Sequence, residues 1–200
     1  MKKIFTAIVA MLLAVPSFAQ FSSGGFELDK NNMYYGARMG LALGSLTGDV
    51  GDYTGMKAGF TLAGIIGLRL SETAPVFLES GLYYTQRGGK DGSHTIDLNC
   101  LELPVLVKYG IKATDDIALL PFAGPYFAYG IAGKMRINDE KTSTFDFLNR
   151  RDMGIKFGCG VEYNLLYAEV AYQFGLVNIA DDDKQSIHAN QVSVNFGVNF

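Results

Sequence analysis

Residues 101–108 read LELPVLVK, and the C-terminal residues 191–200 read QVSVNFGVNF. Apolar side chains occupy every odd position of the first segment and every even position of the second, alternating mainly with polar or small residues. A period of two residues indicates a β-strand with two chemically different faces. Segments of this kind and of about ten residues, repeated along a chain, are typical of a transmembrane β-barrel.

Eight segments carry this alternation. They predict strands near 34–44, 56–70, 76–87, 97–111, 117–132, 152–163, 165–175 and 189–200. Longer polar connections near 45–55, 88–96, 133–151 and 176–188 alternate with short ones at 71–75, 112–116 and 163–165. We therefore predict an all-β fold: an eight-stranded, antiparallel, up-and-down transmembrane β-barrel, with short periplasmic turns and longer loops outside. The 24 glycines, spread through the periodic segments, disfavour helices there.

The first residues predict an export signal. Lys2 and Lys3 precede an apolar stretch over 4–15 that is too short to span a bilayer, and Ser17-Phe18-Ala19 suits cleavage before Gln20. We expect a signal peptide over 1–19, a short lead-in over 20–33 and the barrel over 34–200, located in the outer membrane after export. Without Lys2 and Lys3, 15 of the 17 basic residues remain against 20 acidic ones, which offers no footprint for nucleic acid.

Alternation alone does not say which face meets lipid, because a soluble lipocalin-like barrel would turn the apolar face inward. Three features favour a lipid-facing apolar side. The last residue, Phe200, belongs to that side, and we interpret it as a C-terminal signal for the barrel-assembly machinery. The charged side is rich in glycine and alanine, as a crowded interior requires. Tyrosines also lie at strand ends, where interfacial girdles form: Tyr34, Tyr35, Tyr109, Tyr163 and Tyr167.

Two consecutive strands resemble the PorT-like family of outer-membrane β-barrel domains. The run Leu101–Tyr109 matches its LE-[IL]-P-x-L-x-K strand, and Pro121–Tyr126 matches the P-[YF]-x-x-x-G-P strand that follows. The resemblance covers roughly 34–200 and implies an eight-stranded barrel in a Gram-negative outer membrane. It implies no assigned activity for most members and a part in protein secretion for a few.

The face opposite the apolar one collects the charges of the predicted strands. Since an eight-stranded barrel is just wide enough for its side chains to fill, we expect these charges to pair and plug the lumen; a gated ion path is the alternative. Lys57 and Arg87 are expected at the rim. The predicted lumen network consists of Arg38, Arg69, Glu79, Glu102, Lys108, Lys156, Glu162 and Glu169.

Cys100 and Cys159 are expected to remain free thiols, since their parities place them on opposite faces of the sheet. The histidines fall in Ser93-His94 and Ser186-Ile187-His188, which could suggest a Ser/His hydrolase, but both are expected to be loop or rim residues without a catalytic role.

Two sets of loop charges have possible ligands. Asp181, Asp182 and Asp183, with Asp49 and Asp52, could gather Ca²⁺ but lack the spacing of a calcium loop. Arg150-Arg151 and Lys134-Arg136 could meet lipopolysaccharide phosphates. In both cases solvated loop charge is the simpler interpretation.

The sequence thus predicts a monomeric outer-membrane protein with a closed, charge-plugged lumen and a structural or loop-mediated binding role. No catalytic, cofactor or metal site is expected, and outer-membrane lipid and the assembly machinery are the expected partners. The alternatives are a narrow porin or transport element, a component of a secretion machine, an outer-membrane lipid hydrolase and a soluble lipocalin-like carrier.

Overall fold

A computed structural model of the chain describes residues 32–48, 55–91, 94–114, 116–137, 140–144, 148–180 and 186–200. Side chains are described for all of these residues except those within 90–95 and 135–143. The predicted signal peptide and nearly all of the lead-in lie outside these residues. No helix within the described ranges is long and apolar enough to cross a membrane.

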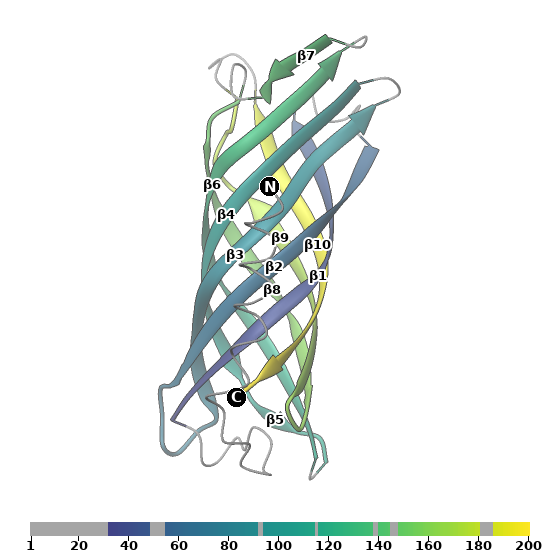
Figure 1. The fold of residues 1–200 in the computed structure, drawn as a ribbon. Coiled ribbons are helices and arrows are strands. Elements are labelled where there is room, and N and C mark those ends of the chain that lie inside the picture. Colours follow the sequence, from purple (N-terminus) through teal and green to yellow (C-terminus); the bar gives the residue numbers. More distant parts are fainter. Residues whose placement is uncertain are drawn as a thin grey trace.

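Eight long strands of the described chain close into an antiparallel barrel (Figure 1). Each pairs with its sequence neighbours, β1 pairs with β10, and β4 pairs with β6 past the short β5. Two short strands, β5 (Ile111–Lys112) and β7 (Glu140–Ser143), add to β6 at its two ends. The barrel strands are β1 (Met33–Gly48), β2 (Gly55–Arg69), β3 (Val76–Asp91), β4 (His94–Tyr109), β6 (Ile117–Ile137), β8 (Arg151–Tyr163), β9 (Leu166–Gly175) and β10 (Ile187–Asn199). The predicted fold is confirmed.

At the long-connection end, seven of the eight long strands extend beyond their predicted limits, and β9 ends at Gly175 as predicted. The predicted loop over 88–96 is mostly a paired hairpin, because β3 continues to Asp91 and β4 begins at His94. Likewise β6 continues to Ile137 and turns back as β7. Backbone pairing continues there without apolar alternation, which is why the sequence pattern ended too early.

The barrel's outer face is apolar in a band bounded by aromatic side chains. Along β4, Leu101, Leu103 and Val107 are exposed on this face, and the band ends at Tyr109. Tyr35 lies at the same end of the barrel and stacks on Phe200, with ring centroids 5.7 Å apart. From Leu101 to Tyr109 the strand covers about the length that crosses a bilayer core when tilted.

Two of the tyrosines assigned to the girdle belong to the interior instead. Tyr34 and Tyr167 are buried, because each shares the inward parity of its strand rather than the parity of Tyr35 or Tyr163. Each ring covers a glycine: Tyr34 lies over Gly67, its cross-strand partner, and Tyr167 lies over Gly160. A Cβ at either glycine would overlap the ring, which explains why the inward parity is rich in glycine.

An apolar cap lies inside the barrel at the long-loop end. Three of its residues face inward from β1 and β10, and three come from the segments before β8 and after β9, where Leu148 and Ala180 form an isolated bridge. The cap consists of Leu46, Leu148, Ile179, Ala180, Ile187 and Ala189. Between this cap and the short-turn end, buried polar and charged side chains lie among smaller apolar clusters, such as that of Leu106, Phe122 and Ala171.

Candidate functional site

Glu79 is the centre of the interior network nearer the short-turn end. Its Oε1 lies 2.8 Å from Lys108 Nζ, its Oε2 accepts a hydrogen bond from Tyr34 Oη at 2.7 Å, and Arg38 Nη2 is 3.7 Å away. Lys108 Nζ also donates to Tyr167 Oη at 2.7 Å. Because β1, β3, β4 and β9 supply these groups, the cluster connects strands on several sides of the barrel.

Glu169 extends this cluster toward β10. Tyr167 Oη donates to Glu169 Oε2 at 2.9 Å, and Asn195 Nδ2 donates to Oε1 at 2.8 Å. Thr61 Oγ1 then donates to Asn195 Oδ1 at 3.0 Å. Both carboxylate oxygens are thereby satisfied in a buried position, as a confined charge requires.

Glu162 has a different environment. Asn199 Nδ2 donates to its Oε2 at 2.7 Å, and Arg38 Nη2 donates to the Oδ1 atom of the same asparagine at 2.6 Å. Arg38 is therefore linked to Glu162 through an amide. Among the described residues no cation lies within ion-pair distance of this carboxylate.

Arg87 is the centre of a second cluster nearer the long-loop end. Its Nη2 lies 2.5 Å from Glu102 Oε2, and its Nη1 lies 2.7 Å from Asp152 Oδ2. Lys156 Nζ is 3.4 Å from Glu102 Oε1, and Tyr126 Oη donates to Asp152 Oδ2 at 3.1 Å. This cluster is neutral, with two cations and two carboxylates, all of them buried.

Seven of the eight residues predicted for the lumen lie in these two clusters, and Arg69 lies apart from them. Arg69 is half-buried near the short-turn end, where its Nε donates to Ser71 O at 2.7 Å and its guanidinium faces the Phe77 ring. Arg87, expected at the rim, belongs to the interior instead, because β3 extends past it.

The residues that sequence reasoning missed have the inward parity of their strands. They are uncharged, apart from Asp152, so a search for charges passed over them. The missed buried polar partners include Tyr34, Thr61, Thr85, Tyr126, Asp152, Tyr167, Gln173, Gln191, Asn195 and Asn199.

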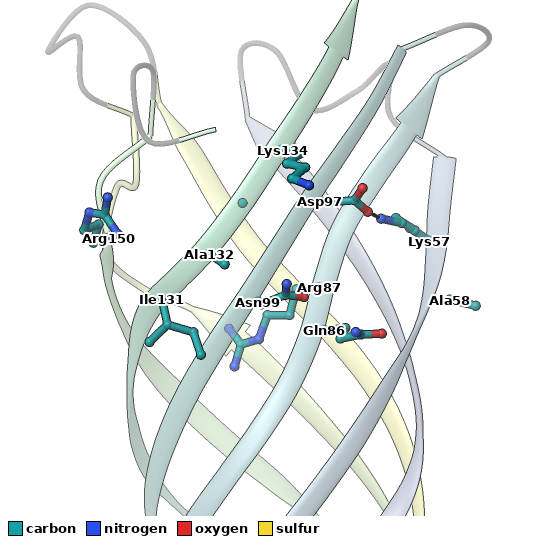
Figure 2. Close-up of a pocket in the computed structure, with 11 residues that line it drawn as sticks. Lys57, Ala58, Gln86, Arg87, Asp97, Asn99, Ile131, Ala132, Lys134 and Arg150 are labelled. Atoms are coloured by element: carbon teal, nitrogen blue, oxygen red, sulfur yellow. Dashed lines mark ion pairs between the residues drawn. The ribbon is translucent and has the colours of Figure 1, made fainter. Parts of the chain in front are cut away.

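A polar pocket of about 630 Å³ lies at the long-loop end of β2, β3, β4 and β6 (Figure 2). Lys57 and Asp97 form an ion pair across β3, and Lys134 lies opposite Asp97 in the register. Arg150 also lines the pocket and donates to Gly130 O at 3.2 Å. Of the basic loop residues named from sequence, Lys134 and Arg150 thus meet at one pocket, whereas Arg151 points to the outer wall.

The predicted Ser/His pair is present as a contact. Ser186 Oγ lies 3.1 Å from His188 Nε2, where β10 begins. A hydrolytic triad also needs an acid that orients the imidazole through Nδ1. His188 Nδ1 has no hydrogen-bond partner among the described residues, so the geometry stops at a pair.

The cysteine prediction is confirmed: Cys100 is buried, Cys159 is exposed, and both are free thiols. Ser93 and the aspartates considered for Ca²⁺ lie outside the described residues, which hold no group of three or more His, Cys, Asp or Glu side chains suited to a metal ion.

Comparison with known proteins identifies the fold and the family. Similar solved structures include Neisserial surface protein A (14% identity, 85% of this chain, 98% of that chain, TM-score 0.52). Another is a major outer membrane protein from Thermus thermophilus (12% identity, 85% of this chain, 100% of that chain, TM-score 0.51). A third is OprG from Pseudomonas aeruginosa (13% identity, 88% of this chain, 99% of that chain, TM-score 0.50). These low identities show the fold alone, and a search of curated proteins found no match.

The model of one family, the outer membrane protein beta-barrel domain, matches residues 18–181. The match spans most of the chain and seven of the eight long strands described above. The chain therefore belongs to the outer membrane protein β-barrel domain family, whose place is the outer membrane.

Proposed function

We propose that the protein is a closed, charge-plugged barrel that anchors its extracellular loops, with a structural or loop-mediated binding role instead of conduction. The observation that carries this proposal is that the buried charges form ion pairs within the Arg87 cluster and within the Glu79 cluster, both of which lie beneath the apolar cap. A conducting path would need fixed charges that face water, whereas these side chains are buried and bind one another.

Planar-bilayer recordings on the purified full-length protein test this proposal. We expect little or no steady conductance from protein that migrates as a folded barrel on unheated gels. Large, stable current steps would overturn it and favour the narrow porin.

We also propose that the chain lies in the PorT-like part of the family. The two matching strands are neighbours in the barrel: Pro104 pairs with Tyr126, and Lys108 pairs with Phe122. Glu102, Lys108 and Tyr126 of these motifs all enter the interior clusters. The charged and tyrosine positions of the two motifs therefore supply partners for the interior plug, which supports a structural role for the residues that carry the resemblance.

A role in a secretion machine is the alternative that this resemblance raises. Affinity purification from detergent-solubilised outer membranes distinguishes this alternative from the proposed anchor of extracellular loops. Recovery of a stoichiometric membrane complex would favour the secretion machine, and recovery of the barrel alone would favour the anchor.

A further inference from the structure

A groove of about 570 Å³ lies on the outer wall of the barrel, at the long-loop end of the apolar band. Two cross-strand rows form its floor. Leu101, Tyr129 and Arg151 are directly opposite one another on β4, β6 and β8. Leu103, Phe127 and Met153 form the row one step nearer the middle of the membrane. Pockets of about 300–1,000 Å³ are large enough to hold small ligands.

The segment after β9 forms a wall of the groove beside these two rows. Both Leu176 N and Val177 N donate to Met153 O, at 2.9 and 3.2 Å, which holds Val177 against the edge of the second row. The groove is therefore a walled hollow in the lipid-facing surface. It opens toward lipid because its floor belongs to the exposed face of the barrel.

Arg151 supplies a charge at the outer end of this hollow. Its side chain is exposed, and it has no hydrogen bond or ion pair with any described residue. The neighbouring carboxylate, Asp152, faces the interior and binds Arg87. The charge of Arg151 is thus available at the outer level of the apolar band, where the headgroups of the outer leaflet lie.

We propose that this groove is a binding site for a phosphorylated outer-leaflet glycolipid. An acyl chain would lie over Leu103, Phe127 and Met153, and Arg151 would bind a phosphate. Arginine binds phosphate through two parallel N–H donors, and Tyr129 beside it suits the same interfacial level. Two facts select this occupant: the groove is continuous with the lipid-facing band, and it pairs an apolar floor with one cation at its outer end. The site does not depend on what the loops bind.

Tryptophan fluorescence tests the site directly, because the chain contains no tryptophan. Phe127→Trp places a reporter in the groove, and Phe196→Trp places one on the exposed face of β10, three strands away around the barrel. Full-length variants are reconstituted in vesicles of brominated phosphatidylcholine, whose acyl chains quench both reporters. Bis-phosphorylated lipid A, which is not brominated, is then added at a few mole per cent.

We expect lipid A to restore the emission of Phe127→Trp far beyond its mole fraction, and that of Phe196→Trp only in proportion. Adding Arg151→Gln should raise the lipid A fraction needed for half recovery by about tenfold, as expected for loss of a hydrogen bond to a charged group. Lys134→Gln, which removes an equal charge from the same end of the barrel outside the groove, should leave the recovery unchanged.

Four results would overturn the proposal. They are proportional recovery at both reporters, excess recovery at both, recovery that Arg151→Gln does not weaken, and equal recovery with unbrominated phosphatidylglycerol, which would mean that any anionic phospholipid suffices. Unheated gels confirm beforehand that each variant is a folded barrel.

Discussion

Arg87 Nη1 donates a hydrogen bond to Asp152 Oδ2 at 2.7 Å and so joins β3 to β8 across the lumen. Around the wall these strands are separated by β4 and β6. The Tyr126 hydroxyl donates to the same oxygen, and the guanidinium of Arg87 lies 5.2 Å from the centre of that tyrosine's ring. One side chain from each of three strands is therefore fixed at a single point.

Asp152→Ala should destabilise the barrel strongly, because it leaves Arg87 buried with half of its partners removed. Breaking a buried ion pair from one side costs about 3–5 kcal/mol. The free energy of unfolding, measured by urea titration in lipid vesicles and followed by circular dichroism, checks the size of the loss. The double variant Arg87→Met with Asp152→Leu is the control and should recover part of it. A single variant within about 0.5 kcal/mol of wild type would contradict the assignment.

Glu79 and Glu162 should respond differently to the same substitution. Glu79→Gln loses the ion pair with Lys108 at 2.8 Å and weakens the attraction to Arg38, so we expect a loss of about 3 kcal/mol. Glu162→Gln can still accept the hydrogen bond from Asn199 and gives up no ion pair with a described residue, so the change should stay within about 1 kcal/mol. The same urea titration compares the two. Equal losses would show that the carboxylates do not differ in pairing.

The strands and their two faces were predictable because successive side chains of a strand point to opposite faces of the sheet. Parity alone gathers the charges of the Glu79 cluster, from Arg38 to Lys108, on one face. The apolar parity of Phe200 and the glycine-rich charged side indicate that this face is the interior, and the structure places the charges there. Partners were not predictable, because pairing depends on register and on which strands face each other across the lumen. No local pattern in β3 or β8 shows that Arg87 meets Asp152.

The ends of strands were the weakest part of the sequence prediction. Arg69 and Arg87 both have inward parity, but only Arg87 lies deep in the barrel, because β3 continues beyond it while β2 ends at Arg69. Tyr34 and Tyr35 are neighbours in sequence with opposite orientations, and only parity separates interior from girdle. A rule based on tyrosines at strand ends cannot make that distinction.

Two glycines of β2, Gly67 on the inward face and Gly64 exposed on the outer face, provide a comparison for testing the crowded interior. A Cβ at Gly67 would overlap the ring of Tyr34, whereas a Cβ at Gly64 meets nothing within 4 Å. We expect Gly67→Ala to cost about 1–3 kcal/mol through overpacking, and Gly64→Ala to cost nothing measurable. Urea titration of both variants is the measurement. Equal stability of the two would mean that the ring of Tyr34 moves aside freely.

Thiol labelling should distinguish the two cysteines. Cys159 is exposed on the lipid-facing side, and Cys100 is buried in the interior. In vesicles, an apolar maleimide that partitions into the bilayer should label Cys159 slowly, because a thiol in lipid forms little of the reactive thiolate, but still faster than Cys100. A charged maleimide should label neither residue until the protein is unfolded. Mass spectrometry of the digested protein locates the label, with Cys159→Ser as the control. Fast labelling of Cys100 by the charged reagent would show that water passes freely through the lumen.

An arginine scan of the outer face tests the membrane placement itself. Phe196 lies in the middle of the apolar band on β10, and Tyr163 lies at its short-turn edge, where β8 ends. A lipid-facing arginine costs about 2–4 kcal/mol near the bilayer midplane and about 0–1 kcal/mol near the interface. Phe196→Arg should therefore lose more stability in vesicles than Tyr163→Arg. Phe196→Ala, which removes the ring without adding charge, separates the cost of burying a charge in lipid from lost packing. If Phe196→Arg is no more costly than Phe196→Ala, this face meets water, and the outer wall cannot hold an acyl chain in the groove beside Arg151.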